Sequence, residues 1–138
     1  MPALDTNVLV RYLVEDDAEQ LALARQLIGR CIAQGLNLFV PVTVVLELEW
    51  VLRSRYGFGK DQILLTLSGL FSAAELSFES ERALEVALQL FRQGPADLAD
   101  CLHVALAAQA GEPPLWTFDQ GAARVEGARL LNSSSLSG

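Results

Sequence analysis

Residues 4–13, LDTNVLVRYL, place an aspartate between a short apolar strand and an apolar helix. Pro2 to Leu4 are apolar, as expected of a strand, and Thr6 to Leu13 have the periodicity of a helix. Asp5 then lies at the carboxyl end of a strand, where open α/β folds bind their ligands. Because a carboxylate beside a buried element is costly unless it is paired or binds a cation, Asp5 is a candidate functional residue.

Strands and helices alternate along the rest of the chain. Strands are predicted at Asn37–Val40, Leu76–Phe78 and Leu115–Phe118, with an edge strand at Arg129–Leu131. Further helices are predicted from a cap at Asp16 or Asp17 to about Ala33, from a cap at Thr43 to Arg55, over Asp61–Phe71, from a cap at Ser80 through Arg92, and over Asp97–Ala110. This order predicts an α/β protein, a three-layer α/β/α sandwich with a central, mainly parallel sheet.

The composition is that of one domain. The chain has 138 residues, of which 51% are hydrophobic, enough for a single core over residues 1–131. Residues 132–138, NSSSLSG, are expected to be a frayed polar tail. The apolar runs are too short to span a membrane, and MPALDTN lacks the basic region of a signal peptide, so a cytoplasmic protein is expected. Cys31 and Cys101 are expected to be reduced and without chemistry.

Three further acidic residues stand at junctions like that of Asp5. They are Glu47 in VTVVLELEWVL (42–52), Asp97 in GPADLADCLHVALA (94–107) and Asp119 in LWTFDQG (115–121). Taken alone, Asp97 is better explained as a helix cap. The chain has only 10 Lys and Arg against 17 Asp and Glu, so the four acids have few bases to pair with. We therefore expect all four to converge on one rim as a shared divalent metal site.

Carboxylate oxygens are hard ligands that select Mg²⁺, with Mn²⁺ as the alternative. Asp100 is three residues from Asp97 and shares its helix face, which makes it a further candidate. The metal ligands are predicted to be Asp5, Asp97, Asp100 and Asp119. Two such ions can clamp both oxygens of a phosphodiester displacement, with water as the nucleophile. The catalytic set is predicted to be Asp5, Glu47, Asp97 and Asp119, with Thr6 and Asn7 hydrogen-bonding the carboxylates or a bound water.

The net charge of −7 has the wrong sign for a nucleic-acid binder. Bound metal would have to supply much of the positive charge. Arg11, Arg53 and Arg55 are the best candidates for phosphate contacts, although solvated surface positions explain them equally well.

Other residues near these motifs have structural interpretations. His103 is expected to be partly buried and hydrogen-bonded. Trp50 and Trp116 are expected in the core or at an interface. Glu49 projects roughly 160° away from Glu47 on a helix, so it is expected to face solvent or a subunit interface.

Together, LDTNVLVRYL, VLELEWVL, ADLADCLHVALA and LWTFDQG resemble the PIN-domain family from about residue 3 to residue 131, most closely the VapC-like toxins of bacterial toxin–antitoxin pairs. The resemblance implies a Mg²⁺- or Mn²⁺-dependent endoribonuclease. It also implies a homodimer and an antitoxin protein that fills the groove near the acids. The positions that match the family are Asp5, Glu47, Asp97 and Asp119, an additional acid at Asp100, and the polar pair Thr6 and Asn7.

Two other classes of α/β protein with an acidic pocket are each excluded by one residue. A phosphotransferase of the haloacid dehalogenase type needs a general acid where this chain has Asn7, and a receiver domain needs a late lysine, whereas the one lysine is Lys60. A non-catalytic PIN-like module that binds RNA or protein stays open as the alternative. Stabilisation by a divalent ion would separate an enzyme from such a module.

Overall fold

The computed structural model describes residues 1–137 and divides into two compact units, residues 1–81 and residues from 82 onward. A single domain over residues 1–131 stays a prediction. Gly138, the end of the predicted tail, lies outside the described residues. No helix within residues 1–137 combines the length and the apolar character that a membrane crossing requires.

The first unit is organised around three parallel backbone segments. Ala3 forms a parallel bridge with Phe39, and backbone hydrogen bonds of 2.7 and 2.9 Å join residues 2–4 to Phe39. Strand β1 (Leu38–Val40) pairs in parallel with strand β2 (Leu76–Phe78). These positions confirm the strands predicted in this half of the chain.

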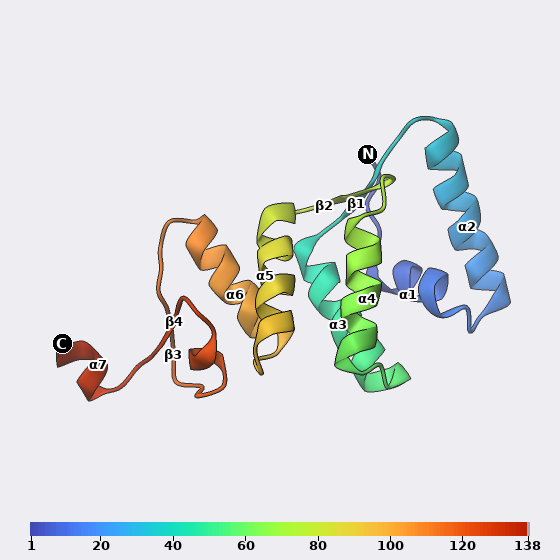
Figure 1. Ribbon diagram of the computed structural model, residues 1–138. Coiled ribbons are helices and arrows are strands. Elements are labelled where there is room, and N and C mark those ends of the chain that lie inside the picture. Colours follow the sequence, from blue (N-terminus) through green and yellow to red (C-terminus); the bar gives the residue numbers. More distant parts are fainter. Residues whose placement is uncertain (138) are drawn as a thin grey trace. The chain divides into compact units, whose positions relative to one another are not determined.

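Four helices accompany these strands (Figure 1). They are α1 (Thr6–Val14), α2 (Ala18–Ala33), α3 (Val42–Tyr56) and α4 (Lys60–Phe71). Helix α1 contacts both α2 and α3, and α3 contacts α4. Their apolar positions supply much of the core of this unit, including the buried side chains of Leu9, Ile28, Val45, Leu48, Leu52, Ile63 and Leu67. Burial of these side chains is the main force that holds the helices in place.

The start of α3 differs from the prediction. The helix begins at Val42, so Thr43 lies inside it, and the preceding Pro41 has no side chain able to cap. The Val42 N–H instead donates to the Glu79 carboxylate at 2.8 Å. Glu79 directly follows β2, so the cap comes from a residue 37 positions away and fastens the start of α3 to the end of a strand. A carboxylate at a helix N-terminus is also favoured by the helix dipole.

The second unit contains helices, a 3₁₀ turn and one strand pair. Its elements are α5 (Glu81–Gln93), which starts at the boundary, α6 (Leu98–Gln109), β3 (Leu115–Thr117), η1 (Ala122–Arg124), β4 (Ala128–Leu130) and α7 (Ser133–Ser137). Strand β3 pairs in parallel with β4, whose position is one residue earlier than predicted. Ser80, the predicted cap of α5, has a φ of 55°, in the left-handed region.

Residues 133–137 form a short helix, so the expectation of a frayed tail is wrong for this segment. Asn132 explains its start, because its side-chain oxygen accepts from the Ser135 N–H at 2.8 Å. The Ser135 hydroxyl oxygen in turn accepts from the Asn132 N–H at 3.0 Å. This reciprocal pair is a capping arrangement, and it holds a helical turn that buries no side chain.

The predicted fold class is confirmed. Every strand pairing in residues 1–137 is parallel, and helices separate the paired strands, except between β3 and β4, where η1 intervenes. The strands themselves are short, three residues each. Cys31 and Cys101 are both buried, and their reduced state stays a prediction.

Candidate functional site

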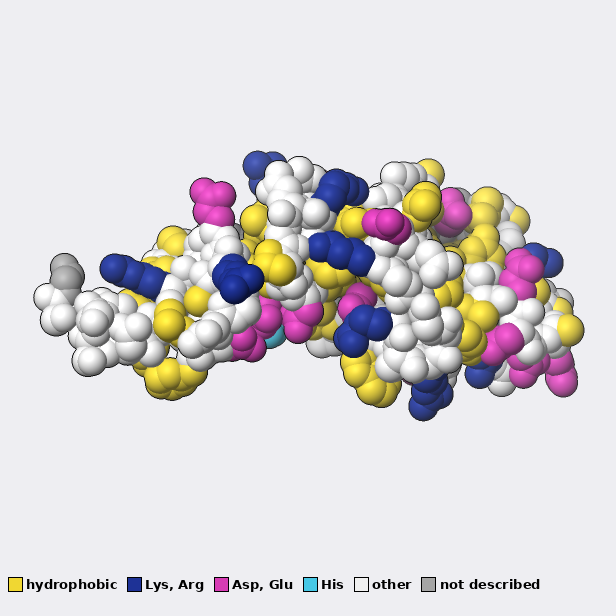
Figure 2. Space-filling model, turned by 60° about the horizontal axis from the view of Figure 1, so that its bottom comes forward, with side chains coloured by type: hydrophobic (Ala, Val, Ile, Leu, Met, Phe, Trp, Pro, Cys, Tyr) yellow, Lys and Arg dark blue, Asp and Glu magenta, His cyan; other side chains and the backbone are white. Residues whose placement is uncertain are grey.

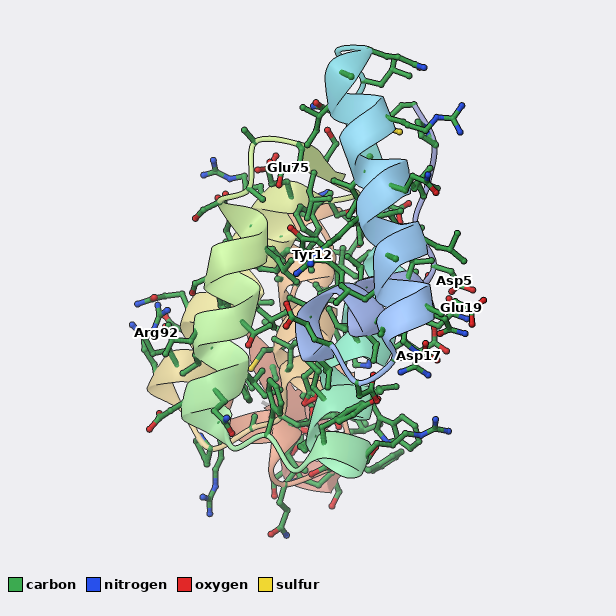
Figure 3. All side chains as sticks on the ribbon, turned by 90° about the vertical axis from the view of Figure 1, so that its right-hand side faces the viewer. Asp5, Tyr12, Asp17, Glu19, Glu75 and Arg92 are labelled. Carbon is green, nitrogen blue, oxygen red and sulfur yellow. The ribbon has the colours of Figure 1, made fainter. Side chains whose placement is uncertain are left out.

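Asp5 and Glu47 are joined through Thr6 in the first unit. Asp5 caps α1, and its carboxylate accepts from the Thr6 N–H at 2.7 Å. The Thr6 hydroxyl donates to Glu47 Oε1 at 2.6 Å, across a sequence separation of 41 residues. Thr6 is buried, whereas both acids are exposed, and Figure 3 shows Asp5 at the outer edge of the view. The buried hydroxyl therefore fixes Glu47 beside the start of α1 and leaves both carboxylates open to solvent.

A cavity of about 270 Å³ opens beside this pair. Helix α1 and the segment before it provide one wall, and α3 provides the other. The lining residues are Asp5, Thr6, Asn7, Val10, Arg11, Glu47, Trp50, Val51, Arg55 and Tyr56. The cavity thus combines acids, two arginines and two aromatic side chains within one unit.

Arg11 is already engaged inside the protein. Its guanidinium donates to Gln20 at 2.6 Å, to the Tyr56 hydroxyl at 3.1 Å and to Asp16 at 3.1 Å. The Tyr56 hydroxyl donates to the other Asp16 oxygen at 2.7 Å. Hydrogen bonding to Tyr56, assisted by the Arg11 charge, lowers the pKa of Asp16, and the Tyr56 hydrogen bond raises the pKa of Arg11.

This cluster of Arg11, Asp16 and Tyr56 ties α1 to the last turn of α3. Asp17, not Asp16, caps α2, accepting from the Gln20 N–H at 3.0 Å. Tyr56 is a site residue that the sequence interpretation missed. Its tyrosine hydroxyl has no local partner in the sequence, so only the folded chain reveals the contact.

The expectation that Glu49 faces solvent or an interface is wrong. Glu49 is only 5% exposed, and its carboxylate accepts from Arg53 Nε at 3.0 Å. The predicted helical phase is right, because Glu47 and Glu49 project to different sides, but the side opposite Glu47 is buried. Arg53, one turn later, supplies the charge that a buried carboxylate requires. Of the three candidate phosphate-binding arginines, Arg55 lines the cavity and has no ion pair within residues 1–137.

Asp97 and Asp119 each cap a turn in the second unit. The Asp97 carboxylate accepts from the Asp100 N–H at 2.9 Å at the start of α6, as the capping interpretation predicts. The Asp119 carboxylate accepts from the Gly121 N–H at 2.7 Å and the Ala122 N–H at 3.3 Å, just after β3. Both side chains belong to exposed residues, so both carboxylates are accessible to a ligand.

The charges of both of these acids affect the pKa of Asp100. Burial raises the pKa of Asp100, and the charge of Asp97, a hydrogen bond with Asp97 and the charge of Asp119 raise it further. His103 has a small opposing effect. A cation would relieve the repulsion within this group. His103 itself is exposed, so the expectation that it is partly buried is wrong.

Within residues 1–137, no three His, Cys, Asp or Glu side chains are already gathered as a ligand set for a metal ion. Asp5 and Glu47 belong to the first unit, and Asp97, Asp100 and Asp119 belong to the second. The expectation that all five acids share one rim involves residues of both units, and it stays a prediction. The donors themselves are all carboxylate oxygens, which is the chemistry that Mg²⁺ and Mn²⁺ favour.

The two tryptophans are not core residues. Trp50 is 52% exposed on the wall of the Asp5–Glu47 cavity, and Trp116 is 41% exposed with the Arg129 guanidinium 5.4 Å from its ring centre. Arginine and lysine side chains are scattered among acidic and apolar ones on the face shown in Figure 2. The sequence interpretation missed that Trp50, three residues after Glu47, lies on a neighbouring part of the same helix face.

Comparison with known proteins covers nearly the whole chain. The family model described as the PIN domain matches residues 3–128. A VapC ribonuclease from Aquifex aeolicus (strain VF5) is 25% identical over 118 residues, which cover 86% of this chain and 87% of the relative. The family match includes all five acids discussed above and all four paired strands except the last two residues of β4. The chain belongs to the PIN domain family.

Proposed function

We propose that this protein is a divalent-metal-dependent endoribonuclease and the toxin of a toxin–antitoxin pair, acting in the cytoplasm. The observation that carries the proposal is the pair of exposed acids, Asp5 and Glu47, held together by buried Thr6 at a cavity of about 270 Å³. Membership of the PIN domain family and similarity to a VapC ribonuclease support the same activity.

The acids are proposed to act as ligands and as positioning groups. Asp5, Asp97, Asp100 and Asp119 would hold Mg²⁺ or Mn²⁺ through oxygen atoms. Bound there, the ion supplies positive charge that polarises a phosphodiester and makes water more acidic. Glu47, oriented by the Thr6 hydroxyl, is placed to accept a proton from the attacking water. Asn7 lines the same cavity and is placed to hydrogen-bond water or substrate.

The proposed partners are RNA, an antitoxin protein and a second copy of the chain. Arg55 is the leading candidate for a phosphate contact, because Arg11 and Arg53 hold ion pairs with Asp16 and Glu49. A homodimer is supported by two exposed apolar side chains one turn apart on α2, Leu23 at 60% and Leu27 at 39%. A contiguous exposed apolar patch is typical of protein interfaces.

The activity can be tested by RNA cleavage with Mg²⁺, with Mn²⁺ and with a chelator. We expect cleavage in both metals, none with chelator, and loss of cleavage in Asp5→Asn and in Asp97→Asn. Each substitution preserves side-chain volume but removes a charged oxygen. The matched control is Asp61→Asn, at an exposed acid in the first turn of α4. Near wild-type cleavage by both Asp5→Asn and Asp97→Asn, with normal thermal melts, would refute the assignment.

A non-catalytic module that binds RNA or protein is the second candidate. The capping hydrogen bonds of Asp97 and Asp119 favour it, because they give these acids a structural role. Thermal melts with and without Mg²⁺ distinguish the two. An enzyme that binds the ion in its folded state gains stability with concentration, whereas a module that lacks the site shows no change.

A further inference from the structure

Trp50 is the largest side chain on the cavity wall and is 52% exposed. It lies three residues after Glu47 on α3, so the two side chains occupy neighbouring positions on the helix surface. Leaving half of an indole in water forfeits a large hydrophobic contribution to folding. We therefore expect the exposed face of Trp50 to contact a binding partner rather than the core of the first unit.

The groups around Trp50 specify the chemistry of that partner. Arg55 lines the same cavity and holds no ion pair within residues 1–137, so its charge is available to an anion. The cavity also contains Asp5 and Glu47, which repel a polyanion unless a cation lies between. An aromatic face next to a guanidinium suits a nucleotide, because the ring can stack on the flat base and the guanidinium can pair with the phosphate. A nucleotide has a single phosphate charge, so the acid pair repels it less than it repels a polyanion.

The overall charge strengthens this argument. A chain with a net charge of −7 gains little from long-range attraction to phosphates. Binding of RNA must then draw on contacts that do not depend on net charge. Stacking of a base on an aromatic ring is such a contact, with a contribution of roughly 1–3 kcal/mol per base.

We propose that Trp50 stacks on an unpaired nucleobase of the RNA substrate and that Arg55 contacts a neighbouring phosphate, which aligns the strand with the Asp5–Glu47 pair. The inference rests on the proposed function and adds a binding residue to it. A base inside a duplex has both faces covered, so the contact selects unpaired nucleotides. It tolerates any base, because every base has a π-face.

The test measures binding of a short fluorescein-labelled single-stranded RNA to the full-length protein with Mg²⁺ present, in an Asp97→Asn background that is expected not to cleave the RNA. Trp50→Leu keeps an apolar side chain but removes the aromatic face, and Trp50→Phe keeps an aromatic face. We expect the Kd to rise about 5- to 150-fold in Trp50→Leu, which corresponds to the loss of one stacked base, and by no more than about threefold in Trp50→Phe. Leu65→Ala, at a 76% exposed position on α4, is the control.

Fluorescence gives a second readout. The chain has two tryptophans, so Trp50 is the sole indole in a Trp116→Phe background. Its emission should be quenched by single-stranded RNA and unchanged by the same RNA as a duplex. An unquenched emission, or a Kd for Trp50→Leu within about twofold of wild type, overturns the proposal.

Cleavage and light scattering separate this inference from the proposed function. If wild type cleaves RNA and Trp50→Leu has an unchanged KM, the stacking role is wrong and the nuclease stands. If wild type does not cleave but RNA binding depends on Trp50, the nuclease is wrong and the stacking role stands. If Trp50→Leu changes the molecular mass in solution, a second copy of the chain occupies this surface, and the proposal is overturned.

Discussion

Substitution of two acids on one helix should separate catalysis from stability. Glu47→Gln removes the exposed carboxylate that accepts from Thr6, and Glu49→Gln removes the buried carboxylate that accepts from Arg53. Both changes keep the size of the side chain and a carbonyl oxygen that can still accept a hydrogen bond. Any difference between the variants therefore reports on charge at two sides of α3.

The cost of Glu49→Gln follows from its contact with Arg53. A hydrogen bond between charged groups contributes about 1.5–3 kcal/mol and a neutral one about 0.5–1.5 kcal/mol, so loss of the charge costs about 1 kcal/mol. Arg53 is half exposed, so water can hydrate it once the carboxylate is gone. For a chain of this length, about 1 kcal/mol corresponds to a fall in Tm of about 3 °C.

Arg53→Gln should cost more, because it leaves the buried Glu49 carboxylate without its cation. Removal of one partner from a fully buried pair costs about 3–5 kcal/mol. Since Arg53 is half exposed and water reaches the pair, we expect about 2–3 kcal/mol. The order of stability should be wild type, then Glu49→Gln, then Arg53→Gln.

The assay measures thermal melts and metal-dependent RNA cleavage on the same samples. Glu47→Gln should keep its Tm within about 2 °C and lose cleavage by about a hundredfold or more. Glu49→Gln should lose about 3 °C and keep cleavage at temperatures below its melt. The reasoning is refuted if Glu49→Gln is the inactive variant while its Tm is unchanged.

Three further predictions concern stability, pH and assembly. Glu79→Ala should lower the free energy of unfolding by about 1 kcal/mol, because it removes the cap at Val42. The control Glu85→Ala, at an exposed position on α5, should leave the free energy of unfolding unchanged. Equal melting temperatures for the two variants would contradict the capping role. The raised pKa of Asp100 means that the folded state binds a proton more tightly than the unfolded state, so the stabilisation present below pH 3.8 is lost as pH rises through the folded pKa. With chelator, Asp100→Asn should therefore exceed wild type in Tm more at about pH 7 than at about pH 3, and a constant difference would speak against the repulsion. Light scattering should give twice the 15.0 kDa mass of one chain, and a monomer at micromolar concentration would count against the dimer.

Local sequence patterns predicted the elements well because the forces that set them are short-range. Apolar periodicity placed α2, α4 and α6 within a few residues of their observed ends. The Asp97 cap depends on a hydrogen bond to a backbone group three residues away, so it followed from the sequence alone, whereas the Asp5 cap was not predicted. The phase of α3 was also predictable, since a helix turns by a fixed angle per residue.

The five candidate acids come from the sequence and stay predictions, whereas the side chains that hold two of them in place come from the structure. The family motifs identified the five acids, and the family match over residues 3–128 agrees with that resemblance. The partners that position them come from distant segments: Thr6 reaches Glu47, and Arg11 reaches Tyr56. No local pattern encodes such contacts, because each depends on how α1 packs on α3.

The sequence by itself determined the alternation of helices and strands and the positions of the acidic motifs, because periodicity and backbone capping act over a few residues. Only the tertiary structure decided that Glu79 caps α3, that Glu49 is buried against Arg53 and that Trp50 is exposed beside the acids. Burial is a property of the assembled elements. An apolar stretch such as VTVVLELEWVL has residues facing in every direction around the helix, and packing alone selects which of them meet solvent.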